Sequence, residues 1–148
     1  MAAVEWRRDG YCISTDPGRM DRDAIHAFLR DTYWAAGIPR EIADRSIDHS
    51  LAFGLYDEAS QVGFARVITD RATFAYVADV YVLPSHRGRG LAKWLMEVIR
   101  SHPDLQGLRR WVLLTRDAHA LYRKVGFRGV EDAGRYMEIV DREVYARP

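Results

Sequence analysis

The chain has 148 residues, of which 48% are hydrophobic and 29% are charged. This size and composition are typical of one globular domain and exclude the collagen-like, disordered and coiled-coil classes. The 22 basic and 21 acidic side chains leave a formal net charge of +1, which is too small for the overall field to gather nucleic acid. We therefore expect a single domain over residues 1–148 and no nucleic-acid partner.

The cysteine content and the distribution of apolar residues bear on where the protein is expected to reside in the cell. Cys12 is the single cysteine, so it cannot form an internal disulfide, which favours a reducing cytoplasm. A lone thiol is more often buried filler than a nucleophile. The N-terminus has no apolar run of the length of a signal peptide, and no later stretch approaches the roughly 20 apolar residues of a membrane span. We expect a soluble, cytoplasmic protein with no membrane partner.

The first third of the chain is expected to hold one strand and two helices. The strand lies around residues 11–14. Asp21 can cap a helix that Gly37 would end. Its apolar stripe contains Ile25, Phe28 and Leu29. Pro39 suits the first turn of a second helix, because the N–H that proline lacks is unpaired there in any case.

Three strand-like runs follow, at residues 51–56, 61–69 and 74–82. The first two are joined by a polar segment of the length of a hairpin loop. The third is apolar except for Asp79. Its length and its aromatic and β-branched residues indicate a strand that is covered on both faces.

The last third of the chain is expected to contain two helices and two strands. Residues 88–101 have the spacing of an amphipathic helix, and residues 111–114 have the content of a buried strand. Asp117 can cap a short helix that Gly126 closes, and residues 135–140 form the last expected strand. The order strand, two helices, three strands, helix, strand, helix, strand is a mixed α/β layout.

A glycine-punctuated turn joins the third of those runs to the helix that follows it. The turn reads Arg87-Gly88-Arg89-Gly90. Glycine has no Cβ, so the backbone can approach a ligand closely, and the first N–H groups of a helix point outward at its positive end. Such a turn can hold a pyrophosphate. It matches neither the GxGxxG pattern nor a Walker loop, and taken alone it could be a basic turn without a ligand.

Two motifs in the chain resemble those of the GNAT superfamily of acyl-CoA-dependent N-acyltransferases. Arg87, Gly90 and Ala92 match the [QR]xxGx[GA] pattern of the family's pyrophosphate loop, and residues 118–127 are similar to its later AxxLYxKxGF signature. The order of elements is also similar to the family fold. The resemblance implies a single-domain α/β (α+β) fold. Its mixed, mostly antiparallel sheet would be flanked by about four helices and have a V-shaped splay between two central strands.

The resemblance also implies a site for acetyl-CoA as cosubstrate. Val80, Tyr81 and Val82 match positions whose backbone contacts the pantetheine arm and the thioester carbonyl. A backbone N–H aimed at the thioester oxygen would stabilise the charge that develops there during attack. The same residues also read simply as a core strand, and both interpretations can hold together. The other residues expected to contact acetyl-CoA are Arg87, Gly88, Arg89, Gly90, Leu91 and Ala92.

Two further positions follow from the later motif. Tyr122 matches the tyrosine that protonates the departing thiolate in many members of the family, although it could also be an aromatic side chain on the inner face of a helix. Thr115 stands where many relatives have an asparagine that contacts the cofactor arm. This is a departure from the family pattern, in which a hydroxyl would have to replace an amide.

Asp79 is the candidate for the group that takes a proton from the amine. An amine is mostly protonated at neutral pH, so a carboxylate or a water chain must accept a proton before attack. Asp79 is the only acidic side chain in its apolar run, and a buried carboxylate usually has a partner or a raised pKa. The equal alternative is that Asp79 pairs with an arginine such as Arg66, as a structural or substrate-binding anion.

Two aromatic side chains are candidates for the acceptor pocket. Tyr33 and Trp34 lie near the junction of the two early helices, which borders the acceptor site in the family that the chain resembles. Packing between the helices is an equal alternative for both. His86 and His119 flank the two motifs and are expected to be solvated neighbours. No residues have metal-ligand spacing, so we expect no metal.

The leading hypothesis is an N-acetyltransferase that transfers an acetyl group from acetyl-CoA to a primary amine of a small molecule or peptide. Transfer would occur by direct attack in a ternary complex. One alternative is a non-catalytic acyl-CoA binding or sensing domain. Another is acetylation of a protein amine or of an aminoacyl-tRNA, and the near-neutral charge disfavours the tRNA. Many relatives pair through their later strands, so a homodimer is also compatible with the sequence.

Overall fold

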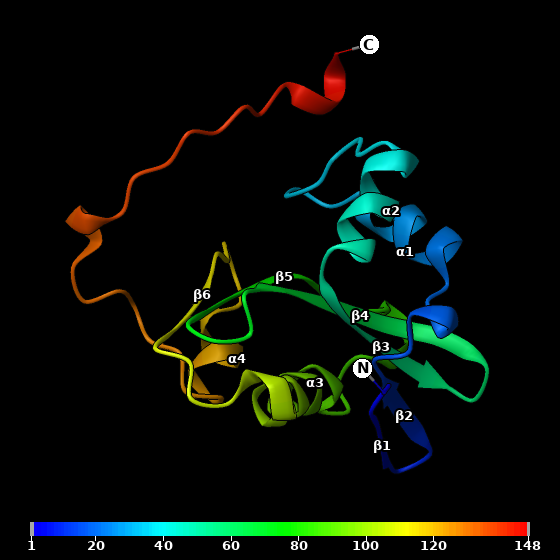
Figure 1. Cartoon of the computed structure of the whole chain (residues 1–148). Coiled ribbons are helices and arrows are strands. Elements are labelled where there is room, and N and C mark those ends of the chain that lie inside the picture. Colours follow the sequence, from blue (N-terminus) through cyan, green and yellow to red (C-terminus); the bar gives the residue numbers. More distant parts are fainter. Residues whose placement is uncertain (1, 148) are drawn as a thin grey trace.

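The computed structural model describes residues 2–147, which fold into one sheet with helices on both faces (Figure 1). In this range there are six strands, namely β1 (Glu5–Arg8), β2 (Tyr11–Ser14), β3 (Leu51–Asp57), β4 (Ser60–Thr69), β5 (Phe74–Val82) and β6 (Arg110–Leu113). The same range contains four α-helices, namely α1 (Arg22–Leu29), α2 (Arg40–Asp48), α3 (Leu91–Ser101) and α4 (His119–Arg123). The expected mixed α/β fold is confirmed.

Within residues 2–147, the sheet divides where its one parallel pair of strands begins. Strands β1 to β5 are antiparallel neighbours in chain order, and β6 is parallel to β5. The β5–β6 pairing runs from Phe74↔Arg110 to Val77↔Leu113 and stops there, although β5 continues to Val82. The second half of β5 therefore has no strand neighbour on that side, which is the V-shaped splay expected from the sequence.

A β-bulge in β5 lies at the same place. Phe64 of β4 pairs with Tyr81, whereas Arg66 pairs with Ala78, so the extra residue on β5 falls between these two pairs. Asp79 has a φ of 57°, in the left-handed region that L-residues adopt rarely. The bulge thus sits at the start of the splayed half of β5, a placement that re-aims the side chains of this strand.

Helices α1 and α2 cover one face of the sheet, and α3 and α4 cover the other (Figure 1). Alternate strand residues therefore face different cores. Ala52 packs with the apolar residues of α1 and α2, while the adjacent Phe53 packs against α3. In the same way, Phe64 packs with the residues of α1 and α2, and the adjacent Ala65 packs in the core on the α3 side. The two cores hold the splayed strands in place from both sides.

The early helices begin where the sequence predicts, but α1 ends sooner. The side chain of Asp21 accepts a hydrogen bond from the N–H of Ala24 at 3.0 Å, and α2 begins directly after Pro39. The first helix ends at Leu29, so the prediction that Gly37 ends it was wrong. The chain turns back instead, because Gly37, with a φ of 74°, donates its N–H to the carbonyl of Arg30. This turn places residues 30–38 at the mouth of the splay.

The two later helices start differently from the prediction. Helix α3 begins at Leu91 rather than at residue 88, because Gly88 and Gly90 have φ values of 80° and 73°, which no helix contains. Helix α4 begins at His119 without a side-chain cap from Asp117. The hydroxyl of Thr115 instead accepts a hydrogen bond from the N–H of Ala118 at 3.0 Å.

The prediction of a final strand at residues 135–140 was wrong. This segment has no strand and runs away from the sheet as an extended chain (Figure 1). A strand hydrogen-bonds to a neighbouring strand, and the segment has none among residues 2–147. Conversely, β1 was not expected, because the sequence Glu-Trp-Arg-Arg lacks an apolar face. No helix in the described range is both long and apolar enough to cross a membrane.

Candidate functional site

The turn before α3 leaves room for a ligand at its glycines. A Cβ added at Gly88 or Gly90 would meet no heavy atom within 4 Å, so no protein contact requires glycine at either position. Both have positive φ, and the N-cap Gly90 leaves the first N–H groups of α3 without a side-chain partner. Free N–H groups at the positive end of an eleven-residue helix suit a pyrophosphate. The turn therefore fits the group that the sequence predicts there.

Two side chains hold the turn in position. Arg87 donates from Nε to the carbonyl of Val82 at 2.9 Å, which ties the turn to the end of β5. On the other side, the hydroxyl of Tyr11 on β2 lies 2.9 Å from Nδ1 of His86 and accepts a hydrogen bond from Arg89 at 3.2 Å. His86, expected to be a solvated neighbour, therefore has a defined partner. A cavity of about 170 Å³ lies beside this contact, lined by Arg8, Asp9, Tyr11, Arg89, Gly90, Leu91 and Trp94.

The splayed half of β5 offers its backbone to the space beside the turn. Beyond Val77, no other strand of the described part of the chain pairs with β5 on the β6 side, so backbone groups that face that side are free to bind a ligand. The side chains of Tyr81 and Val82 are buried. Tyr81 stacks on Phe28 of α1, with 3.9 Å between the ring centroids, and burial raises its pKa. The strand is thus both a core element and a free edge.

The connection between α1 and α2 lies across the splay from the turn. Tyr33 and Trp34 are 47% and 43% exposed, so neither is packed in a core. The hydroxyl of Tyr33 accepts a hydrogen bond from the N–H of Arg116 at 3.1 Å, and the guanidinium of Arg116 lies 3.8 Å from the Tyr33 ring centroid. This contact joins the early helices to the segment after β6.

A second contact between the early helices and the sheet is centred on Asp79. Its side chain is 7% exposed and forms an ion pair with Arg66, with 2.5 Å between Nε and Oδ2. Its other oxygen accepts a hydrogen bond from the indole N–H of Trp34 at 2.8 Å. Arg66 also donates to the hydroxyl of Ser50 at 3.1 Å. Both oxygens of Asp79 therefore have donors.

Tyr122 lies on α4, in contact with the larger apolar core. Its ring is 5.9 Å from that of Phe127, and burial raises its pKa from 10.0 to about 12. Its hydroxyl has no hydrogen-bond partner among residues 2–147, so it is available to a bound molecule. Thr115, the other residue predicted from the later motif, uses its hydroxyl to accept the N–H of Ala118.

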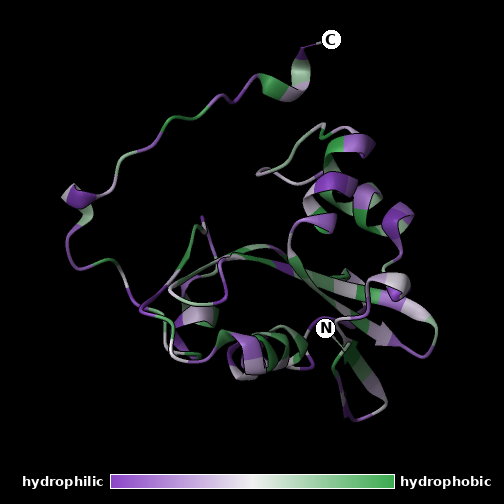
Figure 2. Cartoon of the chain, viewed as in Figure 1, coloured by the Kyte–Doolittle hydropathy of each residue, from purple (hydrophilic) through white to green (hydrophobic). Residues whose placement is uncertain are grey.

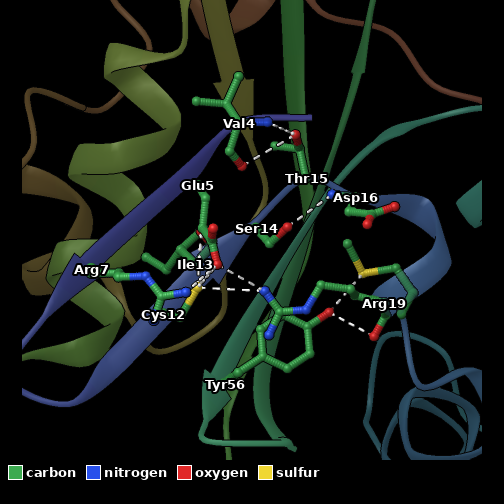
Figure 3. A network of polar contacts seen from close by, with 11 residues as sticks. Val4, Glu5, Arg7, Cys12, Ile13, Ser14, Thr15, Asp16, Arg19 and Tyr56 are labelled. Atoms are coloured by element: carbon green, nitrogen blue, oxygen red, sulfur yellow. Dashed lines mark hydrogen bonds and ion pairs between the residues drawn. The ribbon is translucent and has the colours of Figure 1, made fainter. Parts of the chain in front are cut away.

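Cys12 lies in a different network, at the β1–β2 end of the sheet (Figure 3). It is buried, and its thiol donates to a carboxylate oxygen of Glu5 at 2.9 Å. Arg19 contacts the same carboxylate at 3.1 Å. Burial and the hydrogen bond with Glu5 raise the pKa of the Cys12 thiol, which disfavours a thiolate nucleophile. These contacts give Cys12 a structural role.

Apart from Thr115 and Tyr122, which lie before and on α4, the predicted site residues fall into two groups around the splayed end of β5. One group contains the turn at 87–92 and the end of β5, and the other joins Asp79 to Tyr33 and Trp34. Sequence reasoning missed Tyr11 and Arg116, since neither lies in a motif and each acts through a contact distant in the sequence. A larger, open hollow of about 610 Å³ lies along α2 among charged side chains and contains none of the predicted residues. Residues 2–147 contain no group of three or more His, Cys, Asp or Glu side chains that could hold a metal ion.

Comparison with known proteins agrees with this geometry. The family described as "Acetyltransferase (GNAT) domain" matches residues 48–129. A candidate acetyltransferase of Gibberella zeae is 37% identical over 142 residues, a match that covers 80% of this chain and 79% of that protein.

Solved structures share the fold. That of a candidate GNAT-family acetyltransferase from Xanthomonas campestris is 48% identical, with a TM-score of 0.91 over 94% of this chain and 99% of that one. A candidate acetyltransferase from Clostridium acetobutylicum, solved with acetyl-CoA, is 12% identical, with a TM-score of 0.63 over 94% of this chain and 96% of that one. The latter shows the fold alone. From the family match and the Gibberella and Xanthomonas relatives, we conclude that this chain belongs to the GNAT family of acetyltransferases and is an acyltransferase.

Proposed function

We propose that the protein transfers the acetyl group of acetyl-CoA to a primary amine, by direct attack in a ternary complex. The observation that carries this proposal is the placement of an open glycine turn, at the N-terminus of α3, next to the unpaired half of β5. One element suits a pyrophosphate and the other suits an extended amide-containing arm. GNAT acetyltransferases use acetyl-CoA, which contains both a pyrophosphate and an extended arm with amide groups.

Residues 87–92 and the end of β5 would hold acetyl-CoA. The N–H groups at the start of α3 would bind the pyrophosphate, with Arg87 and Arg89 adding positive charge. The backbone of Val80, Tyr81 and Val82 would bind the arm and direct an N–H to the thioester oxygen. Since that oxygen gains negative charge as the amine attacks, a fixed N–H lowers the barrier. Thr115 would contact the arm through its O–H, because its hydroxyl oxygen accepts the N–H of Ala118 and the hydroxyl proton is left to donate.

Tyr122 would supply a proton to the departing sulfur. A tyrosine hydroxyl is protonated at neutral pH even at its ordinary pKa of 10.0, and burial raises the pKa of Tyr122 further, so the proton that a general acid requires is present. In the transfer, a bond forms between the amine nitrogen and the acetyl carbon while the carbon–sulfur bond breaks. The nitrogen loses one proton and the sulfur gains one, so the protons balance.

Of the two roles considered for Asp79, its contacts favour the anchoring one. A general base must reach the amine with a free lone pair, whereas this nearly buried carboxylate already accepts one hydrogen bond at each oxygen, from Arg66 and from Trp34. We propose that Asp79 positions Trp34 at the mouth of the site and that the proton leaves through water. Trp34 and Tyr33 would then form an aromatic wall for the acceptor.

The decisive experiment measures thiol release from acetyl-CoA in the presence of a panel of primary amines. The panel contains aminoglycosides, polyamines, amino acids and peptides with free N-termini, and mass spectrometry identifies the acetylated product. We expect saturable thiol release with at least one class. Failure of the protein to take up any acyl-CoA saturably in calorimetry would overturn the proposal.

Two other outcomes separate the alternatives. Tight binding of acetyl-CoA without thiol release for any amine, protein substrates included, would favour a sensing domain. A burst of acetyl-enzyme in rapid-quench experiments would exclude direct attack. The buried, hydrogen-bonded Cys12 makes such a burst unexpected. The cytoplasmic location expected from the sequence stays a prediction.

A further inference from the structure

An arginine is fixed at the mouth of the splay by the aromatic residues of the α1–α2 connection. The guanidinium of Arg116 lies 3.8 Å from the centroid of the Tyr33 ring, and the backbone N–H of Arg116 donates to the Tyr33 hydroxyl at 3.1 Å. The Tyr33 ring meets that of Trp34 edge to face, with 5.0 Å between the centroids, and Trp34 donates to Asp79. A continuous chain of contacts therefore runs from the bulge in β5 to Arg116.

The charge of Arg116 is not used within the described part of the chain. Its guanidinium forms no hydrogen bond and no ion pair with residues 2–147, and the residue is exposed. A guanidinium that lies over a ring still has the N–H donors of its edge, which match the two oxygens of a carboxylate. Because the ring already restricts this side chain, binding costs less conformational freedom. Arg116 is therefore a prepared site for an anionic group.

The charges in this cluster favour a carboxylate over a phosphate. Arg66 and Asp79 neutralise each other, which leaves Arg116 as the cation of the cluster. One guanidinium balances the single charge of a carboxylate, whereas a phosphate monoester carries a charge of roughly −1.5 to −2 at pH 7. The acceptor is thus expected to carry one carboxylate.

The proposed acid Tyr122 lies close to the same cluster. Burial raises the pKa of Tyr122, and the neighbouring Tyr33 and Asp117 add to the rise. Asp117 is exposed, and its side chain has no hydrogen bond or ion pair among residues 2–147. Its negative charge attracts a cationic amine toward Tyr122, while Arg116 attracts an anion toward Tyr33. An α-amino acid, which carries both charges close together, suits this arrangement.

The surface beside Arg116 can also cover an apolar side chain. Tyr33 and Trp34 are about half exposed. The connection that contains them is mostly pale in Figure 2, because its residues are largely of intermediate hydropathy. Tyrosine and tryptophan each combine an apolar ring with one polar group, and here the polar groups are already hydrogen-bonded. The rings are left for apolar contact.

From these observations we propose that the acceptor is a free α-amino acid with an apolar or aromatic side chain, whose carboxylate binds to Arg116. Its side chain lies on the wall formed by Tyr33 and Trp34, and its amino group faces the thioester. The amino nitrogen bonds to the acetyl carbon as the carbon–sulfur bond breaks. One proton leaves the nitrogen and one reaches the sulfur, so the products are an N-acetylamino acid and CoA. This inference rests on the proposed function, since it names the acceptor of the same site.

Paired acceptors test the need for the carboxylate. Phenylalanine, leucine and methionine are each compared with the corresponding amide, which lacks the negative charge. We expect kcat/KM for at least one acid to exceed that for its amide by roughly 10- to 100-fold, as for a charge-assisted contact. The amides have the less basic amino group, so amine basicity cannot produce this preference. Equal values within all three pairs, or a preference for the phosphonate analogue of phenylalanine, would overturn the proposal.

Arg116→Gln tests the assigned residue. This variant should lose the preference because kcat/KM falls for the acids and not for the amides, and the KM for acetyl-CoA should not change. Arg109→Gln is the matched control, since Arg109 is also exposed and lies before β6, whereas Arg116 follows it. Both changes remove one charge from an exposed side chain, so both variants should fold. A preference for acids that survives in Arg116→Gln would contradict the assignment.

A binding measurement separates this inference from the proposed activity. N-acetylphenylalanine and N-acetylphenylalaninamide are titrated in calorimetry into the protein with CoA present, where no transfer can occur. The acid should bind at least roughly tenfold more tightly than the amide, and this difference should vanish in Arg116→Gln. That result, without thiol release for any amine, would refute transfer and retain the carboxylate site. Thiol release without any difference in affinity would refute the carboxylate site and retain transfer.

Discussion

The indole N–H of Trp34 donates to Asp79 across the mouth of the splay, at 2.8 Å. The two residues are 45 positions apart and come from the α1–α2 connection and from the bulge in β5. A half-exposed aromatic side chain is thus fixed by a nearly buried carboxylate, which is itself neutralised by Arg66. This contact would couple the conformation of the proposed acceptor side to the strand that would bind acetyl-CoA.

Replacing Trp34 with Phe should separate positioning from cofactor binding. Phe keeps an aromatic wall but has no N–H for Asp79, so we expect kcat/KM for the amine to fall by roughly tenfold, about 1.4 kcal/mol. The KM for acetyl-CoA should not change. Steady-state kinetics with each substrate varied in turn measures both effects. An equal loss for both substrates would contradict the assigned role of Trp34.

Asp79→Asn should act mainly on stability. It leaves the guanidinium of Arg66, 16% exposed, without its counter-charge, and breaking a buried pair costs about 3–5 kcal/mol. The control is the double variant Arg66→Gln, Asp79→Asn, which carries neither charge and should recover much of the loss in urea unfolding. Because the amine must lose a proton before attack, we expect kcat/KM to fall at low pH. This fall should persist in Asp79→Asn. Its disappearance would restore Asp79 as the general base.

Gly90→Glu should abolish acetyl-CoA binding by placing bulk and negative charge against the pyrophosphate. Gly107→Glu is a matched control, because Gly107 also has a positive φ, of 74°, and open space around its missing Cβ. Both variants therefore bear a similar backbone cost of about 1 kcal/mol. Calorimetry should detect binding for the Gly107 variant alone. Retained affinity in Gly90→Glu would remove the turn from the binding site.

Tyr122→Phe should lower kcat by roughly 10²-fold if the hydroxyl protonates the leaving thiolate. Phe keeps the ring that packs on Phe127, so thermal stability and acetyl-CoA affinity should be unchanged. The pKa of about 12 for Tyr122 also means that its acid form persists through pH 10. The kcat profile of the unaltered enzyme should therefore show no loss from this group between pH 8 and 10. An unchanged kcat in the Phe variant would make Tyr122 a packing residue.

The stability of the fold should depend on pH through His102. This side chain is 3% exposed at the end of α3, and burial lowers its pKa below the ordinary 6.5. Above pH 6.5 the ring is neutral in both the folded and the unfolded chain, so its contribution to the free energy of unfolding is at its maximum. Below pH 6.5 the unfolded chain binds a proton before the folded chain does, so the free energy of unfolding decreases as the pH is lowered.

His102→Asn tests this dependence. Asn can still accept the N–H of Asp104, as His102 does at 3.0 Å, but it does not titrate. The variant should be less stable at pH 7 and show a flatter pH dependence between pH 7 and 5 in urea unfolding. His49→Asn, at an exposed histidine, should retain the slope of the unaltered protein. An unchanged slope in His102→Asn would exclude His102 as its source.

The elements that local chemistry determines could be predicted from the sequence. Asp21 is followed by an apolar stripe and caps α1 as expected, and the glycine turn lies between a buried strand and an amphipathic helix. Strand β5 matches its prediction at both ends, because an apolar run bounded by Pro84 leaves little choice.

Features that depend on distant contacts could not be predicted. Asp117 was expected to cap α4, but the geometry after β6 directs the N–H of Ala118 to the hydroxyl of Thr115 instead. Strand β1 forms because the hairpin with β2 supplies its hydrogen bonds, despite its charged residues. Residues 135–140 have the pattern of a strand but no neighbouring strand among residues 2–147. The pairing of Asp79 with Arg66 was one of the two alternatives that the sequence offered, and it is present. The contact of Asp79 with Trp34 could not be predicted, because it requires the tertiary fold.

The bulge at Asp79 also constrains the length of the chain around it. Side chains on a strand alternate between faces, so losing one residue here would turn Val80, Tyr81 and Val82 to the opposite face. Tyr81 would then lose its stacking on Phe28. Insertions and deletions should therefore be absent between Asp79 and Gly90 in functional variants, whereas the exposed loop at 70–73 can change in length.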